Sequence, residues 1–188
     1  MPGFFDALEA RDPAERERLL FERLPAHVAF ARGKTTYYAR LLETIDPAQV
    51  KSREALARLP VTRKADLTEL QKAQKPFGGL NATPTAHLAR IFMSPGPIYD
   101  PEGRRPDFWR AARTLFAAGF RPGDVVLNCF SYHLTPAGSM FETGLHHLDC
   151  AVIPGGVGQT ELQARVIADL EPSGYVGTPS FLKLILEK

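Results

Sequence analysis

Short apolar strands alternate with helical segments through the second half of this 188-residue chain, and this alternation limits the folds that it can form. From Ala86 onward, a segment with helical spacing or composition follows each of four strand-like runs. The expected strands are Leu88–Phe92, Asp124–Cys129, Cys150–Ile153 and Gly174–Gly177, and the expected helices are Asp107–Ala118, Gly138–Leu148, Gln159–Leu170 and Pro179–Lys188. Helices of about a dozen residues supply the crossovers that parallel strands need. We therefore predict an α/β fold with a parallel β-α-β-α sheet unit and right-handed connections.

Residues 1–85 have a different character, with short helical runs separated by prolines. Asp12-Pro13-Ala14-Glu15 combines a capping aspartate, a proline in the first turn and a nearby glutamate, so a helix is expected to begin there. Pro25 is expected to kink or split this helix. Asp46-Pro47 repeats the start signal, and Thr62 is expected to cap a further helix. We expect a helical N-terminal region over 1–85 and an α/β parallel-sheet subdomain over 86–188.

Composition excludes several classes of partner. The 23 Lys and Arg against 21 Asp and Glu leave a net charge of +2, without the basic face that nucleic acids require. Uncharged stretches such as 125–138 contain polar residues and are shorter than the roughly 20 apolar residues that span a bilayer, so no membrane segment is expected. The N-terminus lacks the basic and apolar regions of a secretory signal. Cys129 and Cys150 lie in apolar segments, which favours buried, reduced thiols in a cytoplasmic protein.

Ligands of parallel sheets bind beyond the carboxyl ends of the strands, so the loops after the four expected strands form the candidate site. In the first of these loops, Gly96 permits close approach of the backbone to a phosphate and Ser94 offers a hydroxyl group. Pro95 and Pro97 remove two backbone N–H donors from the same loop, and no Lys-Ser or Lys-Thr pair of a Walker A motif follows. A phosphate loop and a plain turn both remain open as interpretations.

The second loop, 128–138, mixes aromatic, hydroxyl and imidazole groups. Tyr132 and His133 suit a pocket that holds an apolar, even aromatic, substrate with a few polar contacts. The alternative is that Phe130 and Tyr132 pack in the core while His133 lies at the surface. No Gly-x-Ser-x-Gly elbow occurs, so the sequence identifies no catalytic Ser–His pair.

The third loop contains Gly155 and Gly156 directly before an expected helix. Paired glycines allow the backbone to approach a ligand, and the free N–H groups of the helix favour a negative group. Alternatively, Gln159 or Thr160 caps that helix. The nearby residues His146, His147 and Cys150 lack a second pair of spaced ligands, so we predict no metal site.

Seven segments, taken in order, resemble the N-terminal part of the phenylacetate-CoA ligase family. They are Leu59–Leu67, Pro76–Gly79, Phe108–Arg110, Ala118–Val126, Val152–Gly156, Gln159–Glu161 and Gly177–Phe181. The resemblance implies the adenylate-forming superfamily, whose members activate a carboxylate with ATP to an acyl-adenylate and then pass the acyl group to CoA. It therefore implies ATP with Mg²⁺ and CoA as cofactors, and a small-molecule carboxylic acid as substrate.

The resemblance also assigns residues to a site. In the family, the loop after the first strand is a Ser/Thr/Gly-rich phosphate loop that contains a lysine. The chain has Ser94-Pro95-Gly96-Pro97-Ile98-Tyr99 at the matching place, so the phosphate-loop candidates are Ser94, Gly96 and Tyr99. The implied acyl-pocket candidates are Tyr132, His133, Gly138, Gly155, Gly156, Thr178, Pro179 and Ser180. No residue matches a catalytic group of the family.

Length is the main departure from the family, whose members are more than twice as long. Phe181–Lys188 ends inside an amphipathic helix without a stop signal, so we expect a C-terminal truncation and an inactive 188-residue chain. The first hypothesis is thus the N-terminal portion of an AMP-forming acyl- or aryl-CoA ligase. The alternatives are a non-catalytic acyl- or nucleotide-binding module with a degenerate phosphate loop, and a scaffold whose exposed sheet edge pairs with another chain, including a homo-oligomer.

Overall fold

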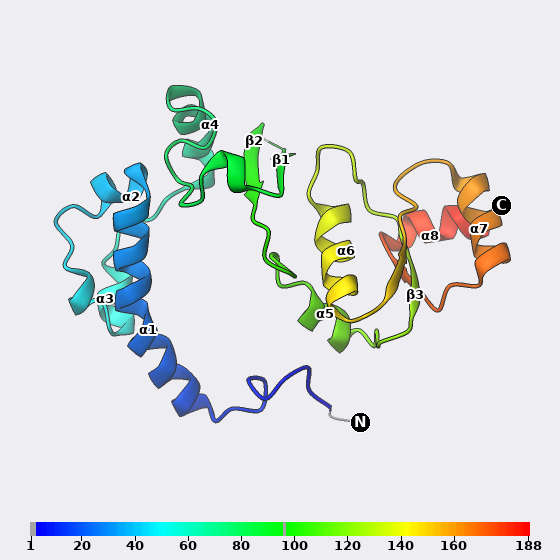
Figure 1. The fold of residues 1–188 in the computed structure, drawn as a ribbon, viewed down its shortest axis with the longest axis horizontal. Helices are drawn as coiled ribbons and strands as arrows, with labels where there is room; N and C mark the ends of the chain where they lie inside the picture. Colours follow the sequence, from blue (N-terminus) through cyan, green and yellow to red (C-terminus); the bar gives the residue numbers. More distant parts are fainter. Residues whose placement is uncertain (1–2, 96) are drawn as a thin grey trace. The chain divides into compact units, whose positions relative to one another are not determined.

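Two compact units make up the chain in the computed structural model, which describes residues 3–95 and 97–188 (Figure 1). Unit 1 comprises Met1–Phe5, Ala89–Ser94 and Glu102–Lys188, and unit 2 comprises Asp6–Leu88 and Pro95–Pro101. Within the described residues, no helix combines the length and the apolar character needed to span a membrane.

Unit 2 is mainly helical. It contains α1 (Pro13–Lys34), α2 (Thr36–Leu41), α3 (Arg53–Ala57), α4 (Lys64–Ala73) and two 3₁₀ turns, Pro47–Gln49 and Thr85–His87. The helix start at Asp12 is confirmed, because its carboxylate accepts hydrogen bonds from the backbone N–H groups of Ala14 and Glu15. The expected split at Pro25 is wrong, since α1 continues through this residue as one helix. A proline removes a single intrahelical hydrogen bond, and the helix is long on both sides of it.

Two other helix-start expectations in unit 2 have different outcomes, since Thr62 is not a cap and Asp46 is. Thr62 does not cap α4, whose N-cap residue is Arg63 without a side-chain hydrogen bond; the Thr62 hydroxyl instead donates to Tyr38 Oη at 3.3 Å. Asp46 caps only the short 3₁₀ turn. The helices pack on a small core of Val28, Leu42 and Val50.

Unit 1 contains the parallel sheet. Its strand order is β4 (Ala151–Ile153), β3 (Val125–Asn128), β5 (Gly174–Val176), with both outer strands parallel to β3. The helices are α5 (Ala112–Ala117), α6 (Ala137–His147), α7 (Thr160–Leu170) and α8 (Pro179–Leu186). Three of the four expected strands therefore form this sheet and all four expected helices are present, although α5 begins at Ala112 rather than at Asp107.

The first expected strand does not join this parallel sheet. It forms β1 (Arg90–Ser94), which pairs with β2 (Ile98–Glu102) in a separate two-stranded sheet. Only residues 95–97 connect the two strands, far fewer than a parallel crossover requires, so they form an antiparallel hairpin. β2 is not predicted by the sequence, because two acidic residues and a proline give it the composition of a loop.

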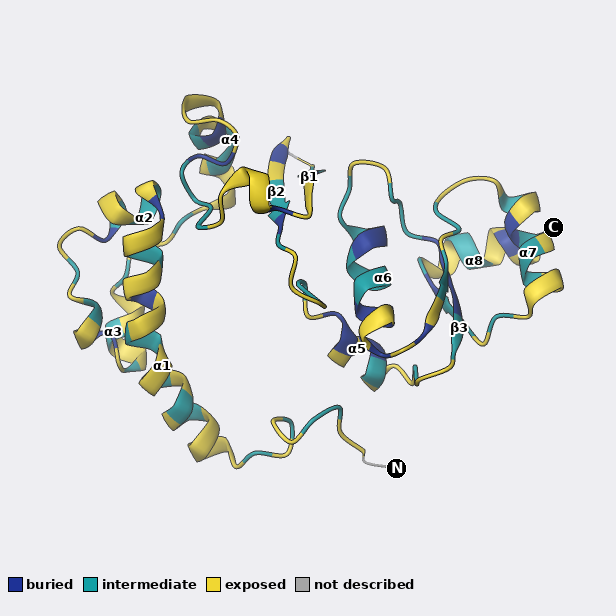
Figure 2. Cartoon of the chain, in the orientation of Figure 1, coloured by how far each residue is buried: buried dark blue, intermediate teal, exposed yellow. Residues whose placement is uncertain are grey.

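Helices cover both faces of the parallel sheet. Val126 and Val176 lie in a core with residues of α5 and α6, including Leu115 and Leu145. The neighbouring residue Leu127 belongs to a second core with residues of α7 and α8. This alternation follows from the two-residue period of a strand. Figure 2 shows the resulting concentration of buried residues along β3 and on α6, which fixes the frame that carries the loops.

Candidate functional site

The loops after β3, β4 and β5 meet at one edge of the parallel sheet, as the parallel arrangement requires. The backbone N–H of Gly156 donates to Asn128 O at 3.0 Å, and that of Cys129 donates to Val176 O at 2.7 Å. These bonds join the end of β3 to the segments that follow β4 and end β5. The structure thus brings the acyl-pocket candidates of all three loops to the same edge.

Asn128 organises the loop after β3, which we call the 130–138 loop. Its side chain is fully buried, and its Nδ2 donates to Tyr132 Oη and to Gly138 O, each at 2.8 Å. Its Oδ1 accepts from the N–H of Phe130 at 3.1 Å. One carboxamide therefore satisfies three groups of the loop and folds it back on the strand end.

Position 138 requires glycine, because Ser131 and Tyr132 of the same loop lie close to it. Its N–H donates to Ser131 O at 3.0 Å, and a Cβ atom at position 138 would lie 2.7 Å from that oxygen and 2.9 Å from the Tyr132 ring. The role of Gly138 visible in the structure is therefore to allow the loop to close.

Tyr132 and His133 occupy different environments. Burial, followed by the neighbouring Glu142 carboxylate, raises the pKa of Tyr132 well above its ordinary value, so its hydroxyl is neutral and bonded to Asn128. The half-buried ring forms a fixed wall of the loop. The side chain of His133 is exposed.

Gly155 and Gly156 have different physical reasons to be glycine. A Cβ atom on Gly155 would lie 2.8 Å from Leu127 Cδ1 and 3.3 Å from Cys129 Sγ, inside the core. Gly156 faces open space but has a φ of +63°, in the left-handed region. Gly155 therefore lets the loop pack on the sheet, whereas Gly156 allows it to turn.

Gln163 of α7 fixes this glycine turn. Its side chain is buried, and its Nε2 donates to Gly155 O at 3.0 Å and to Gly156 O at 2.9 Å. Gln159, one of the two expected caps, is the N-cap residue of α7 but makes no side-chain capping bond, and Thr160 is already the first residue of the helix. The expected side-chain capping by either residue is therefore wrong. The turn before α7 is instead held by Gln163, which lies within the helix.

We expect alanine to destabilise the fold more at position 155 than at position 156. Overpacking against Leu127 should lower the free energy of unfolding of Gly155→Ala by about 2 kcal/mol. In Gly156→Ala only the left-handed backbone opposes the methyl group, which should cost about 1 kcal/mol. Urea unfolding of both variants measures the difference, and a larger loss for Gly156→Ala would contradict this packing.

Thr178, Pro179 and Ser180 form the start of α8 at the same edge. Thr178 Oγ1 accepts from the N–H of Phe181 at 3.4 Å and lies 3.3 Å from Ser180 Oγ, and Pro179 is in the first turn. All three residues are exposed. Their visible role is to cap the helix, with their side chains available at the sheet edge.

The phosphate-loop candidates belong to the β1–β2 hairpin. Ser94 ends β1 in unit 1, Tyr99 lies on β2 in unit 2, and Gly96 lies outside the described residues. Tyr99 is held by Gln71, which bonds to its backbone N–H and carbonyl at 2.8 and 2.9 Å. It lines cavities of about 340 and 370 Å³ in that unit.

The hairpin connection does not fit the phosphates of a nucleotide. Pro95 and Pro97 have no N–H to donate, and residues 94–99 include no lysine. In the described ranges 3–95 and 97–188, no group of three or more His, Cys, Asp and Glu side chains is arranged to hold a metal ion. No step involving the triphosphate is therefore assigned to this hairpin.

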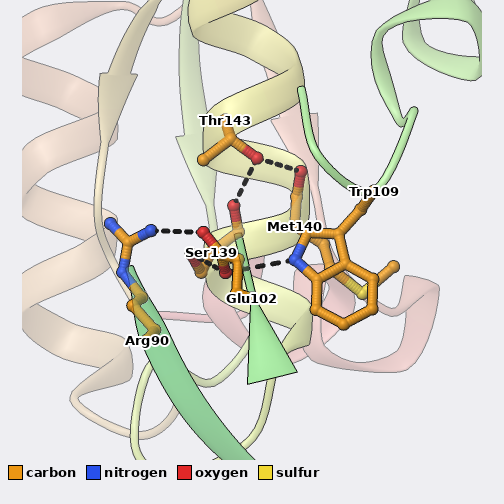
Figure 3. Close-up of polar contacts among 6 residues, drawn as sticks. All are labelled: Arg90, Glu102, Trp109, Ser139, Met140 and Thr143. Atoms are coloured by element: carbon orange, nitrogen blue, oxygen red, sulfur yellow. Dashed lines mark hydrogen bonds and ion pairs between the residues drawn. The ribbon is translucent and has the colours of Figure 1, made fainter. Parts of the chain in front are cut away.

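The carboxylate of Glu102, whose burial the sequence does not predict, is bonded to Ser139, the residue after Gly138 (Figure 3). Glu102 is 2% exposed and accepts hydrogen bonds from Arg90 Nη1 at 2.6 Å, Trp109 Nε1 at 3.1 Å and Ser139 Oγ at 3.3 Å. The only sequence signal is a charged residue at the end of what proves to be a strand.

Cys129 directly follows β3 and is buried with a free thiol. Burial raises its pKa from 9.0 to about 11. Because the folded-state pKa is raised, the stability contributed by the neutral thiol is present below pH 9.0 and is lost as the pH rises towards 11. In a Cys150→Ser background, we expect iodoacetamide at pH 8 to modify native Cys129 about 100-fold more slowly than the urea-unfolded chain. Equal rates would contradict this burial.

No protein-family model matches the sequence, but the chain is similar to curated proteins of known activity. The phenylacetate-coenzyme A ligase of Aromatoleum evansii is 31% identical over 196 aligned residues, which cover 100% of this chain and 43% of that protein. The ligase of the same name from Thermus thermophilus is 34% identical over 186 residues, which cover 94% of this chain and 41% of that protein. The chain thus spans less than half the length of these relatives.

Solved structures agree with this comparison. A 2-hydroxyisobutyryl-CoA ligase in the postadenylation state, in complex with 2-HIB-AMP, superposes with a TM-score of 0.83 at 29% identity, covering 93% of this chain and 39% of that one. An open conformation of that ligase, in complex with 2-HIB-AMP and CoA, gives 0.83 at 30% identity, with coverage of 93% and 40%. The fold is therefore that of the adenylate-forming CoA ligases. Within that class, the chain belongs to the phenylacetate-CoA ligase family and corresponds to its N-terminal portion.

Proposed function

We propose that this chain forms the acid-binding wall of the site in an AMP-forming carboxylate-CoA ligase. The observation that carries the proposal is the Asn128 network, which holds the half-buried Tyr132 ring at the carboxyl edge of β3. An aromatic wall beside exposed polar groups such as His133 suits an apolar or aromatic carboxylic acid. We place this function in the α/β subdomain, residues 86–188.

The activity of the whole protein follows by analogy with its relatives. Ligases of the family are named for phenylacetate and coenzyme A, and the superposed ligase holds an acyl-AMP and CoA. We therefore propose ATP with Mg²⁺ and CoA as cofactors of the complete enzyme, with residues outside this chain binding the nucleotide, and a cytoplasmic location. The chain alone is expected to bind the acid without turning it over.

A second candidate, a non-catalytic acyl-binding module, is favoured by one observation. The hairpin at the matching place of the family's phosphate loop has two prolines and no lysine. A protein that kept the acid-binding loops but lost phosphate binding would bind an acid without forming an adenylate.

One pair of measurements separates these functions. ATP–pyrophosphate exchange by the longest natural form of the protein, across a panel of aryl and aliphatic acids, tests the ligase. Thermal-shift titration of the 188-residue chain with the same acids tests whether this chain binds a carboxylic acid. Acid-dependent exchange supports the ligase, and a thermal shift without exchange supports the binding module. Concentration-dependent assembly without any effect of acids would contradict both and support a scaffold.

A further inference from the structure

Glu102 is a buried carboxylate that links three separate segments of unit 1. Its three donors come from separate segments: Arg90 from the start of β1, Trp109 from the segment before α5, and Ser139 from α6. Figure 3 shows these side chains converging on the carboxylate at the end of β2. A buried charge is retained at a cost in free energy unless such partners surround it.

The elements that Glu102 joins lie on either side of the 130–138 loop. On one side, β1 contacts the loop directly, since the N–H of Met93 donates to Leu134 O at 2.8 Å. On the other side, Ser139 follows Gly138, whose carbonyl accepts from Asn128. The position of the loop therefore depends on the distance between β1 and α6, and Glu102 bonds to both.

We propose that Glu102 is a positioning residue for acid binding. Its carboxylate holds β1 and α6 at the separation at which the 130–138 loop presents Tyr132 and His133 at the sheet edge. The inference rests on the proposed function where it concerns the acid, but its effect on the loop is independent of any ligand.

The chemistry of the three partners explains why this position carries a carboxylate. Arg90 and Trp109 are donors only, and the Ser139 hydroxyl also donates here. A carboxylate accepts with both oxygens, with Arg90 on Oε1 and Trp109 and Ser139 on Oε2. In Glu102→Gln, the NH₂ group must face either Arg90 or Trp109, whichever way the carboxamide is turned. The substitution keeps the shape of the side chain but replaces one of these hydrogen bonds by a repulsive contact between two donors.

The first arm of the test follows the loop without a ligand. Amide hydrogen exchange is measured for Met93, whose N–H bonds to the loop, and for Cys129, whose N–H bonds to Val176 within the sheet. In Glu102→Gln we expect Met93 to exchange about tenfold faster while Cys129 keeps its protection. A merely structural role would instead lower the protection of both amides together. The control is Glu187→Gln, which removes an exposed partner of Lys183 on α8 and should change neither.

The second arm measures the affinity of the 188-residue chain for phenylacetate by calorimetry. Glu102→Gln is expected to weaken it about tenfold, and Glu187→Gln to leave it unchanged. Wild-type protection of Met93 together with wild-type affinity would overturn the positioning role. If the wild-type chain binds no acid, the proposed function fails while the exchange arm still decides the role of Glu102. Should Glu102→Gln not fold, Ser139→Ala, which removes one donor, must show the same selective loss at Met93 or the proposal is wrong.

Discussion

Replacing Asn128 by alanine is expected to lower the free energy of unfolding by about 3 kcal/mol. The carboxamide is 0% exposed and bonds to Tyr132 Oη, Gly138 O and Phe130 N. Alanine would leave the backbone groups of Gly138 and Phe130 without their partner and open a cavity at the end of β3. Urea unfolding measures the loss, and phenylacetate binding should fall with it because the 130–138 loop loses its anchor.

The matched control for this prediction is Asn81→Ala. Within the described part of the chain, the Asn81 side chain makes only a local bond, to Thr83 O at 2.8 Å, so its removal should change the free energy of unfolding by less than about 0.5 kcal/mol. Equal effects of the two substitutions would show that burial of Asn128 does not hold the loop.

Valine at Gly144 is expected to destabilise the protein by about 3 kcal/mol. Gly144 lies on α6 at its contact with α5, where a Cβ atom would be 2.8 Å from Ala111 Cβ, 2.9 Å from Leu115 Cδ1 and 3.0 Å from Ala112 N. The two helices would have to separate, because one of these atoms is backbone and another is a fully packed methyl carbon. Thermal unfolding of the variant gives the size of the effect.

Gly33→Val is the control for this second prediction. Gly33 also lies in a helix, α1, but a Cβ atom there would meet nothing within 4 Å. Valine has a slightly higher helix propensity than glycine, so this variant should be neutral or more stable by about 0.5 kcal/mol. A loss at Gly33 as large as that at Gly144 would contradict the packing explanation.

Local signals were sufficient for much of the fold. The Asp12 cap with its following proline, and the apolar runs of β3, β4 and β5, each depend on neighbouring residues and were found from spacing alone. β2 was not found, because the pairing of β1 and β2 overrides the loop-like composition of Ile98–Glu102. The same pairing removed β1 from the parallel sheet.

The candidate site was predicted in part. The strand ends located the 130–138 loop and the Gly155 turn correctly at one edge, because parallel strands direct their carboxyl ends to the same side. The bonds that Asn128 and Gln163 make to these loops could not be predicted from strand positions. A polar residue at the end of an apolar strand was the one available hint for Asn128, and Gln163 reads as an ordinary helical residue until its burial is known.

The sequence by itself determined the order of helices and strands and the family resemblance, since periodicity, capping and motif order are properties of neighbouring residues. Only the tertiary structure decided which polar groups are buried together. Glu102 and Ser139 are 37 positions apart, and the residues next to either one in the sequence do not predict that the two are in contact. A buried charge is stable only where distant donors converge on it, and that convergence exists only once the strands and helices have packed.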